Sequence, residues 1–480
     1  MRTALPHLLA AHVVRSKGCV PRARYGARCY LAGVPRLLLL FLLLIAAFHA
    51  TRVLREPRPN ADRPMDFRTC YVGQDVLRHG ENPYNDATLK AGWQHLVQHE
   101  HLASRTQPGL PNLPFLYPPW AAALFGVSVG QLPYAVAWPL WYVLALLSLG
   151  LLAGLWPRVL RAENAPTVPW WQFLLFALAL KGTVPALLTG QPTFAALALG
   201  VGALAVLAAS AKTLEASAAG VAEGAISSKA TAFPAHGWRP VLTGLLLGLA
   251  AFKVTLLLPF AAWFLWKKQW LALAVAAAVV VLLSALAWYW SAFPVDLLPT
   301  YQHLLAQVHA QSFDPADSDY PLTQGLTLRL ELGNVLEWLR PGSSAAHPWL
   351  HGALWLAALG WLARQWRRGQ RLAGWYVFLV VATLTLLTTY HLYYDAVLLL
   401  PLLAFARYLP RCGQWLLLLA LLPLLLPLNG IALALGNPAG LQLLYFLPPL
   451  GLLGVLALLL ARPVDSTSRR PRVASKAELG

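Results

Sequence analysis

Long apolar runs constrain this chain more than any other feature. Segments of about 20 mostly apolar residues, the length of a bilayer-spanning helix, recur along nearly the whole sequence. The first is VPRLLLLFLLLIAAFHATRVL at 34–54, and only 12% of all residues are charged, about half the share typical of soluble domains. We therefore predict an all-α, polytopic membrane protein. A single membrane domain should cover 34–461, because no soluble stretch is long enough to bury a core of its own.

The basic residues predict the orientation of the chain in the membrane. The formal net charge of +18 comes from short clusters of Lys and Arg at segment ends. This is the positive-inside pattern, and it favours a membrane protein over a nucleic-acid-binding one. The tails 1–33 and 462–480 are both basic, so we expect both in the cytoplasm. The four cysteines are not spaced in pairs, and neither a disulfide framework nor a metal cluster is predicted.

About twelve crossings follow from these runs, with extracytoplasmic loops at 55–134 and 292–347. The expected crossings lie near 34–54, 135–156, 169–188, 192–210, 240–266 as a pair of half-helices, 269–291, 348–363, 374–389, 391–407, 414–430 and 441–461. Two segments allow a second interpretation. Residues 114–132 could cross instead of lying along the outer surface, and 240–266 could form one helix. The single helix would place Lys253 near the bilayer centre at high cost, so we favour the broken form. The alternative inverts 135–239 and leaves both outer loops in place.

The stretch RPMDFRTCYVGQDVLRHGENPY at 63–84 follows the first span and is unusually rich in ionisable groups. It predicts a juxtamembrane helix over 67–79, ended by the turn residues of HGENPYND. Asp66 could act as a general base that takes a proton from an attacking hydroxyl. It could instead be a solvated loop acid or a partner of Arg63 or Arg68, and spacing alone favours this plainer interpretation.

Three further ionisable residues lie within or at the ends of apolar runs. Lys253 could hold a phosphate oxygen as a point charge, or extend to the interface as many membrane lysines do. His391 could hydrogen-bond a phosphate, with Asp395 one turn later fixing its tautomer. It could also belong to an interfacial belt with Tyr390 and its aromatic neighbours. No phosphate-binding loop, dinucleotide motif or serine nucleophile motif is present in the sequence.

Six short motifs occur in one order over most of the chain, and together they resemble glycosyltransferase family 87. Members of this family are membrane enzymes of the GT-C superfamily that use a polyprenyl-phosphate sugar. The motifs are Asp66-Phe67 with Tyr71, Gly80-Glu81-Asn82-Pro83-Tyr84, Tyr117-Pro118-Pro119, Gly190-Gln191, GLLLGLAAFK ending at Lys253, and the late His391. Two positions depart from the pattern. Cys70 replaces a usual aromatic residue, and TQGL at 323–326 replaces an expected Asn-Gln-Ser-like element.

The resemblance implies a fold, a reaction and residue roles. It implies a GT-C-like fold with extracytoplasmic juxtamembrane helices and an inverting transfer of a sugar, mannose, to a glycolipid or glycan at the outer membrane face. Asp66 would be the base, Lys253 and His391 would hold the donor phosphate, and Asp395 would support them. Tyr84, Tyr117 and Gln191 would face the sugar or acceptor, with Trp93 nearby. No cofactor is expected beyond the lipid-linked donor, and no residue is assigned to a metal, although the sequence leaves open whether the reaction needs one. No nucleic acid is expected as a partner.

Two other classes of protein fit a chain of this composition. A transporter or flippase would move a lipid-linked saccharide without making or breaking a bond. A non-catalytic subunit of a membrane assembly is the second. The enzyme differs from both in needing the Asp66 carboxylate for chemistry.

Overall fold

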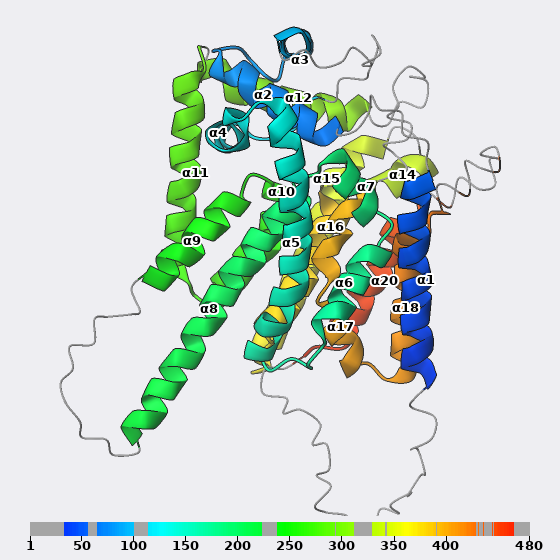
Figure 1. The fold of residues 1–480 in the computed structure, drawn as a ribbon. Coiled ribbons are helices and arrows are strands. Elements are labelled where there is room, and N and C mark those ends of the chain that lie inside the picture. The colour runs from blue at the N-terminus through cyan, green and yellow to red at the C-terminus, as the bar shows by residue number, and fades with distance from the viewer. Residues whose placement is uncertain are drawn as a thin grey trace, which may run out of the picture. The chain divides into compact units, whose positions relative to one another are not determined.

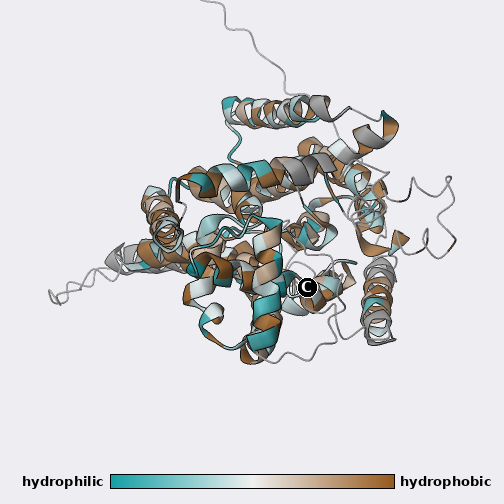
Figure 2. Ribbon diagram, turned by 90° about the horizontal axis from the view of Figure 1, so that it is seen from above, coloured by the Kyte–Doolittle hydropathy of each residue, from teal (hydrophilic) through white to brown (hydrophobic). Residues whose placement is uncertain are grey.

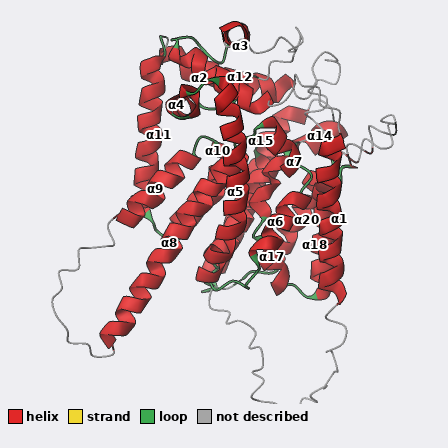
Figure 3. Ribbon diagram, viewed as in Figure 1, coloured by secondary structure: helices red, strands yellow, loops and turns green. Residues whose placement is uncertain are grey.

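The computed structural model is helical, as the sequence predicts (Figure 3). It describes residues 33–55, 65–99, 114–222, 238–292, 294–311, 329–340, 343–389, 391–428 and 446–464, with 431, 435 and 444. Within these ranges there is no strand, and one isolated bridge joins Arg329 to Leu392. The chain divides into two compact units, Met1–Phe41 and Leu42–Gly480. Helix α1 (Gly33–Arg55) continues from the first unit into the second. Most of the two predicted cytoplasmic tails, at 1–32 and 465–480, lies outside the described residues.

Among the residues that the structure describes, two long helices have the length and composition to cross a membrane. They are α5 (Tyr134–Ala162) and α11 (Trp270–Trp290), and hydrophobic side chains such as Leu147 and Leu282 are exposed on them. An apolar surface that faces outward is what a lipid-contacting helix presents. Hydrophobic residues recur along the helices when they are seen from above (Figure 2). A bent pair of helices would make a third crossing among the described residues, so the figure of about twelve stays a prediction.

That bent pair replaces the continuous span expected near 169–188. The structure has α6 (Trp170–Ala179) and α7 (Thr183–Thr189), which meet at an angle of 78°. Gly182 allows the close approach that bends them, because a Cβ there would lie 2.4 Å from the Cα of Tyr394. The backbone N–H of Lys181 donates to the carbonyl of Leu424 at 3.0 Å, so it finds a partner outside its own helix.

The expected break before Lys253 is present in the structure. Helix α9 (Trp238–Ala250) ends there, and α10 (Val254–Trp266) begins directly after the lysine. The backbone carbonyl of Ala251, which lies in the break, accepts a hydrogen bond from the Trp120 indole at 3.0 Å. The side chain thus supplies a partner that a continuous helix would have supplied from its own backbone.

Four shorter helices gather at one end of α5 and α11 (Figure 1). They are α2 (Met65–Arg78), α3 (Asp86–His99), α4 (Pro119–Val127) and α12 (Pro294–Gln311). The first of these confirms the predicted juxtamembrane helix to within two residues, and Gly80 follows it with a φ of 83°. Helix α4 has nine residues and is about 14 Å long, too short to cross a hydrocarbon core of about 30 Å. Its length agrees with 114–132 lying along a surface.

The central helix α16 (Gly374–Thr388) is buried along its whole length and packs against α10 and α20 (Leu447–Ala461). The ring of Phe378, on α16, contacts the rings of Trp156 and Trp263, which also contact each other. Helix α8 (Thr193–Ala222) packs against α5 and α9. The remaining elements are η1 (Val129–Gln131), α14 (Gly333–Leu339), η2 (Ser343–Ala346), α15 (His347–Arg367), η3 (Tyr393–Leu399), α17 (Leu402–Phe405), η4 (Ala406–Tyr408) and α18 (Arg411–Leu425).

The segment predicted as a span at 391–407 departs from a regular α-helix. It consists of the 3₁₀ turns of η3 and η4 with the four residues of α17 between them. Pro401 contributes to this irregularity, because it has no N–H to donate to a preceding carbonyl. Irregular backbone at such a position is acceptable in a membrane protein where it is buried in the protein, and residues 395–400 are buried.

Candidate functional site

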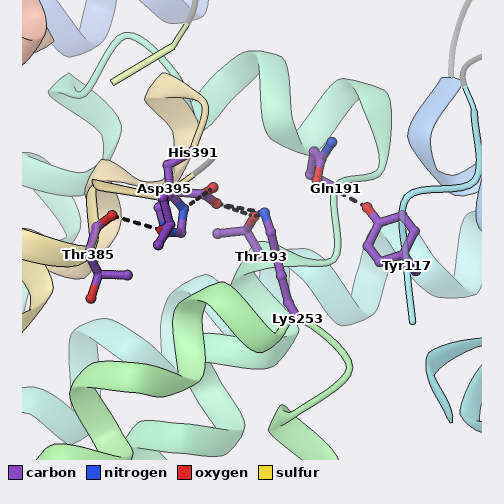
Figure 4. A network of polar contacts seen from close by, with 8 residues as sticks. Tyr117, Gln191, Thr193, Lys253, Thr385, His391 and Asp395 are labelled. Carbon is purple, nitrogen blue, oxygen red and sulfur yellow. Dashed lines mark hydrogen bonds and ion pairs between the residues drawn. The ribbon is translucent and has the colours of Figure 1, made fainter. Parts of the chain in front are cut away.

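The buried carboxylate of Asp395 joins three polar side chains of the candidate site (Figure 4). Its Oδ1 accepts hydrogen bonds from the Lys253 ammonium at 2.6 Å and from the Thr193 hydroxyl at 2.9 Å. Its Oδ2 lies 2.8 Å from Nδ1 of His391. The Lys253 ammonium also donates to the hydroxyl oxygen of Thr193 at 2.6 Å. The side chains of Thr193, Lys253, His391 and Asp395 are called the cationic cluster below, after the ammonium of Lys253.

The ends and breaks of helices bring these four residues together. Lys253 caps the start of α10, Thr193 begins α8, and His391 precedes η3, which carries Asp395. The sequence prediction paired His391 with Asp395 across one helical turn. The structure confirms the pairing, although Leu392 is extended and the residues after it are 3₁₀ rather than α-helical.

His391 supplies one open hydrogen-bonding position. His391 is fully buried, and its Nε2 has no hydrogen-bond partner among the described residues. With Nδ1–H donating to Asp395, Nε2 of a neutral ring accepts a hydrogen bond, and Nε2 of a protonated ring donates one. A ring that carries both protons could therefore donate from Nε2 to an anion.

The charge of Lys253 is already offset by Asp395 within the cluster. The side chain of Lys253 is 13% exposed, that of Asp395 is 3% exposed, and the ammonium also lies 4.8 Å from the centre of the Tyr394 ring. An ammonium has three N–H donors, and two of them are used by Asp395 and Thr193. One donor of Lys253 and Nε2 of His391 therefore remain for a ligand such as a phosphate.

The carboxylate of Asp66 lies beside this cluster. It occupies the first turn of α2 and accepts hydrogen bonds from the side chains of Thr189 and Gln191. Burial raises the pKa of Asp66 above its ordinary value of 3.8. These two hydrogen bonds and the charge of Lys253 act in the opposite direction, and the charge of Asp395 adds to the increase. A carboxylate with a raised proton affinity is suited to the role of general base.

Gly190 allows α2 to approach the turn that carries Gln191. It has a φ of 72°, and a Cβ there would lie 2.6 Å from the Cβ of Phe67, the neighbour of Asp66. Its carbonyl accepts a hydrogen bond from the Trp141 indole at 2.9 Å. A side chain at this position would be strained by its backbone conformation and would push α2 away.

Tyr117 and Tyr84 form a support beside Asp66. The Tyr117 hydroxyl donates to Oε1 of Gln191 at 3.5 Å, which leaves the amide NH₂ of Gln191 to donate to Asp66. The Tyr84 hydroxyl donates to the backbone carbonyl of Tyr117 at 2.9 Å. Tyr84 is buried between Phe115 and other rings, so its observed contact is with Tyr117. A direct contact of either tyrosine with a sugar stays a prediction.

Two further positions from the sequence have clear surroundings. Cys70 is buried one turn after Asp66 and hydrogen-bonds Tyr117, so the place of the usual aromatic residue holds a small side chain. The ring of Trp93 lies 4.4 Å from the guanidinium carbon of Arg68. The segment 323–326, Arg63 and Tyr390 lie outside the described residues.

The structure thus places six of the seven predicted site residues in two hydrogen-bonded groups: Asp66 with Gln191 and Tyr117, and Lys253 with Asp395 and His391. Tyr84 lies one contact behind Tyr117. Sequence reasoning missed Thr189, Thr193 and Tyr394. Thr189 and Thr193 flank the predicted Gln191 in the motif TGQPT at 189–193, but the motif does not indicate which distant segments these threonines meet. Where side chains are described, no group of three His, Cys, Asp or Glu residues could hold a metal ion.

A known protein family matches this chain. The pattern of glycosyltransferase family 87 matches residues 115–389, which is more than half of the chain. The chain belongs to glycosyltransferase family 87. Family membership and the apolar helices together identify a membrane glycosyltransferase. The matched range contains Tyr117, Gln191 and Lys253, whereas Asp66 and His391 lie outside it. No curated protein matches the chain.

Proposed function

We propose that this family 87 glycosyltransferase transfers mannose from a polyprenyl-phosphate donor to a hydroxyl of a glycolipid or glycan acceptor at the extracytoplasmic face. The observation that supports this most strongly is the placement of a partly buried carboxylate, Asp66, beside the cationic cluster. A base and a set of phosphate-binding donors in one site are what a single displacement at a sugar phosphate needs.

In the proposed reaction, the acceptor oxygen attacks the anomeric carbon of the donor sugar. Asp66 takes the proton of the acceptor hydroxyl as the new C–O bond forms. The bond between the anomeric carbon and the phosphate oxygen breaks, and its electron pair stays on the phosphate. Because attack comes from the side opposite the phosphate, the configuration at the anomeric carbon inverts.

The cationic cluster would stabilise the departing phosphate. The free donor of Lys253 and Nε2–H of a protonated His391 would hydrogen-bond its oxygens, where negative charge grows in the transition state. Asp395 would hold both groups in place, with one carboxylate oxygen on Lys253 and the other on His391. The lipid chain of the donor requires the phosphate to lie near the membrane surface, which agrees with a site at helix ends rather than along a helix.

Purified protein offered polyprenyl-phosphate-mannose and a panel of glycolipid acceptors tests this function. The account predicts an acceptor product heavier by one hexose, release of polyprenyl phosphate, and an anomeric configuration opposite to that of the donor. A flippase would instead move the donor across a vesicle membrane and form no glycosidic bond. Donor movement without product, across the whole panel, would favour that alternative class.

A further inference from the structure

One five-residue turn contacts both parts of the site. In the 189–193 turn, the side chains of Thr189 and Gln191 hydrogen-bond Asp66. At its other end, the hydroxyl of Thr193 accepts a hydrogen bond from Lys253 at 2.6 Å and donates one to Asp395 at 2.9 Å. Figure 4 shows Gln191 and Thr193 on the same stretch of chain, with Tyr117 on one side and the cationic cluster on the other.

The backbone of this turn is held in place by several independent restraints. Gly190 adopts a φ of 72°, which ordinary side chains avoid, and its carbonyl is bound by the Trp141 indole. Pro192 has its φ fixed by its ring. Gln191 donates its backbone N–H to the carbonyl of Ala186 at 2.9 Å, and Gln191 and Thr193 are both buried. The separation between the two ends of the turn is therefore set by rigid backbone.

The Thr193 hydroxyl has the hydrogen-bonding capacity that this position needs. A hydroxyl offers one donor and two acceptor lone pairs, so it can accept a hydrogen bond from Lys253 and donate one to Asp395 at the same time. Thr193 is fully buried, and water has no direct access to replace it. Without the hydroxyl, the ammonium of Lys253 would keep its contact with Asp395 but lose the contact that ties it to the turn.

We propose that Thr193 is a positioning residue for the transfer reaction, holding the phosphate-binding groups at a fixed distance from the base on the same turn. This inference rests on the proposed function, because it assumes that Lys253 meets the donor phosphate and that Asp66 is the base. In this role Thr193 acts through its contacts with Lys253 and Asp395. A displacement of about 1 Å between reacting groups can lower the rate about 100-fold, so a small change in the distance between the base and the phosphate-binding groups has a large effect.

Three substitutions at this position separate the hydroxyl from its surroundings. Thr193→Ser keeps the hydroxyl, Thr193→Ala lacks it but otherwise matches the serine variant, and Thr193→Val replaces it with a methyl group at similar volume. Thr243→Val is the matched control. Thr243 is also a buried threonine, on α9, and its hydroxyl has no hydrogen-bond partner within the described ranges.

The experiment measures kcat, the KM values for polyprenyl-phosphate-mannose and for the acceptor, and the thermal midpoint of each purified variant. Thr193→Val and Thr193→Ala should lower kcat by about 10- to 100-fold, with the acceptor KM within about threefold of wild type. Thr193→Ser and Thr243→Val should keep kcat within about threefold. If Thr193→Val does not fold, the comparison of Thr193→Ser with Thr193→Ala still isolates the hydroxyl.

The outcomes distinguish this inference from the proposed function. If wild-type protein transfers mannose and the Ala and Val variants match it in kcat, the positioning role is wrong and the function stands. The positioning role is also wrong if Thr193→Ser loses as much kcat as Thr193→Ala, because the hydroxyl is then not the cause. If wild-type protein forms no transfer product, the proposed function fails and this inference fails with it.

Discussion

Substitution of Asp395 by Asn should expose how strongly the site depends on one buried ion pair. The ammonium of Lys253 lies 2.6 Å from the Asp395 carboxylate, and both side chains are largely withdrawn from solvent. Removing one partner of a buried pair typically lowers the free energy of unfolding by about 3 to 5 kcal/mol, because the other charge stays buried without compensation. Asp395→Asn should therefore destabilise the protein by about that amount. It should also lower turnover, because His391 loses the carboxylate that orients it.

A double-mutant cycle measures the coupling free energy between the charges of Asp395 and Lys253. Lys253→Met removes the charge that Asp395→Asn leaves unpaired. The free energy of unfolding lost by the double variant should therefore be at least about 2 kcal/mol smaller than the sum of the losses of the two single variants. The exposed pair Asp86–Lys90 has the same 2.6 Å separation, with side chains 60% and 52% exposed. The corresponding cycle, Asp86→Asn with Lys90→Met, should give a coupling of no more than about 0.5 kcal/mol.

Chemical denaturation in mixed micelles, followed by tryptophan fluorescence, provides these free energies. The prediction needs a large coupling for the buried pair and a small one for the exposed pair at equal distance. Additive losses for Asp395→Asn and Lys253→Met, to within about 0.5 kcal/mol, would refute the reasoning, because the two charges would then be energetically independent.

Three further predictions follow from the site. Lys253→Ala and His391→Ala should each weaken binding of the polyprenyl-phosphate donor more than binding of the acceptor, and unchanged donor affinity in both would remove their phosphate role. As the pH is lowered, the transfer rate should begin to fall at a pH above 3.8, the ordinary pKa of an aspartate, because burial raises the pKa of Asp66 and the base works only when it is ionised. A pH–rate profile of the folded enzyme that is flat through that region would contradict this. Gly190→Ala should lower the thermal midpoint and the rate together, because the backbone conformation disfavours a side chain and the added Cβ would lie 2.6 Å from the Cβ of Phe67; activity equal to wild type would show that α2 does not depend on this contact.

Features that depend on local sequence were predictable. The all-helical class follows from the apolar runs, and the juxtamembrane helix at 65–78 follows from its mixed face and the turn that ends it. The break before Lys253 was predictable from the cost of a charge in hydrocarbon. The pairing of His391 with Asp395 followed from their spacing, even though the backbone between them is not a regular helix.

Features that depend on tertiary packing were not predictable. The bend between α6 and α7 falls at Lys181-Gly182 in an otherwise apolar run, and its geometry is explained by the close approach of Gly182 to Tyr394, more than 200 residues away. Thr193 is an ordinary residue in the sequence, and its importance appears only when Lys253 and Asp395 reach it from two other segments. Side chains that connect distant segments carry no local pattern by which sequence reasoning could select them.

The rate of sugar transfer by Asp66→Asn tests the central claim most directly. An asparagine can keep the shape of Asp66 and a hydrogen bond to each of Thr189 and Gln191, because the threonine hydroxyl can accept as well as donate. The substitution also removes a buried negative charge, so the protein should remain folded and should bind the donor nearly as wild type does. The account predicts a loss of transfer rate of about 100- to 10,000-fold from polyprenyl-phosphate-mannose. Transfer within tenfold of wild type by the folded variant would contradict the assignment of Asp66 as the base.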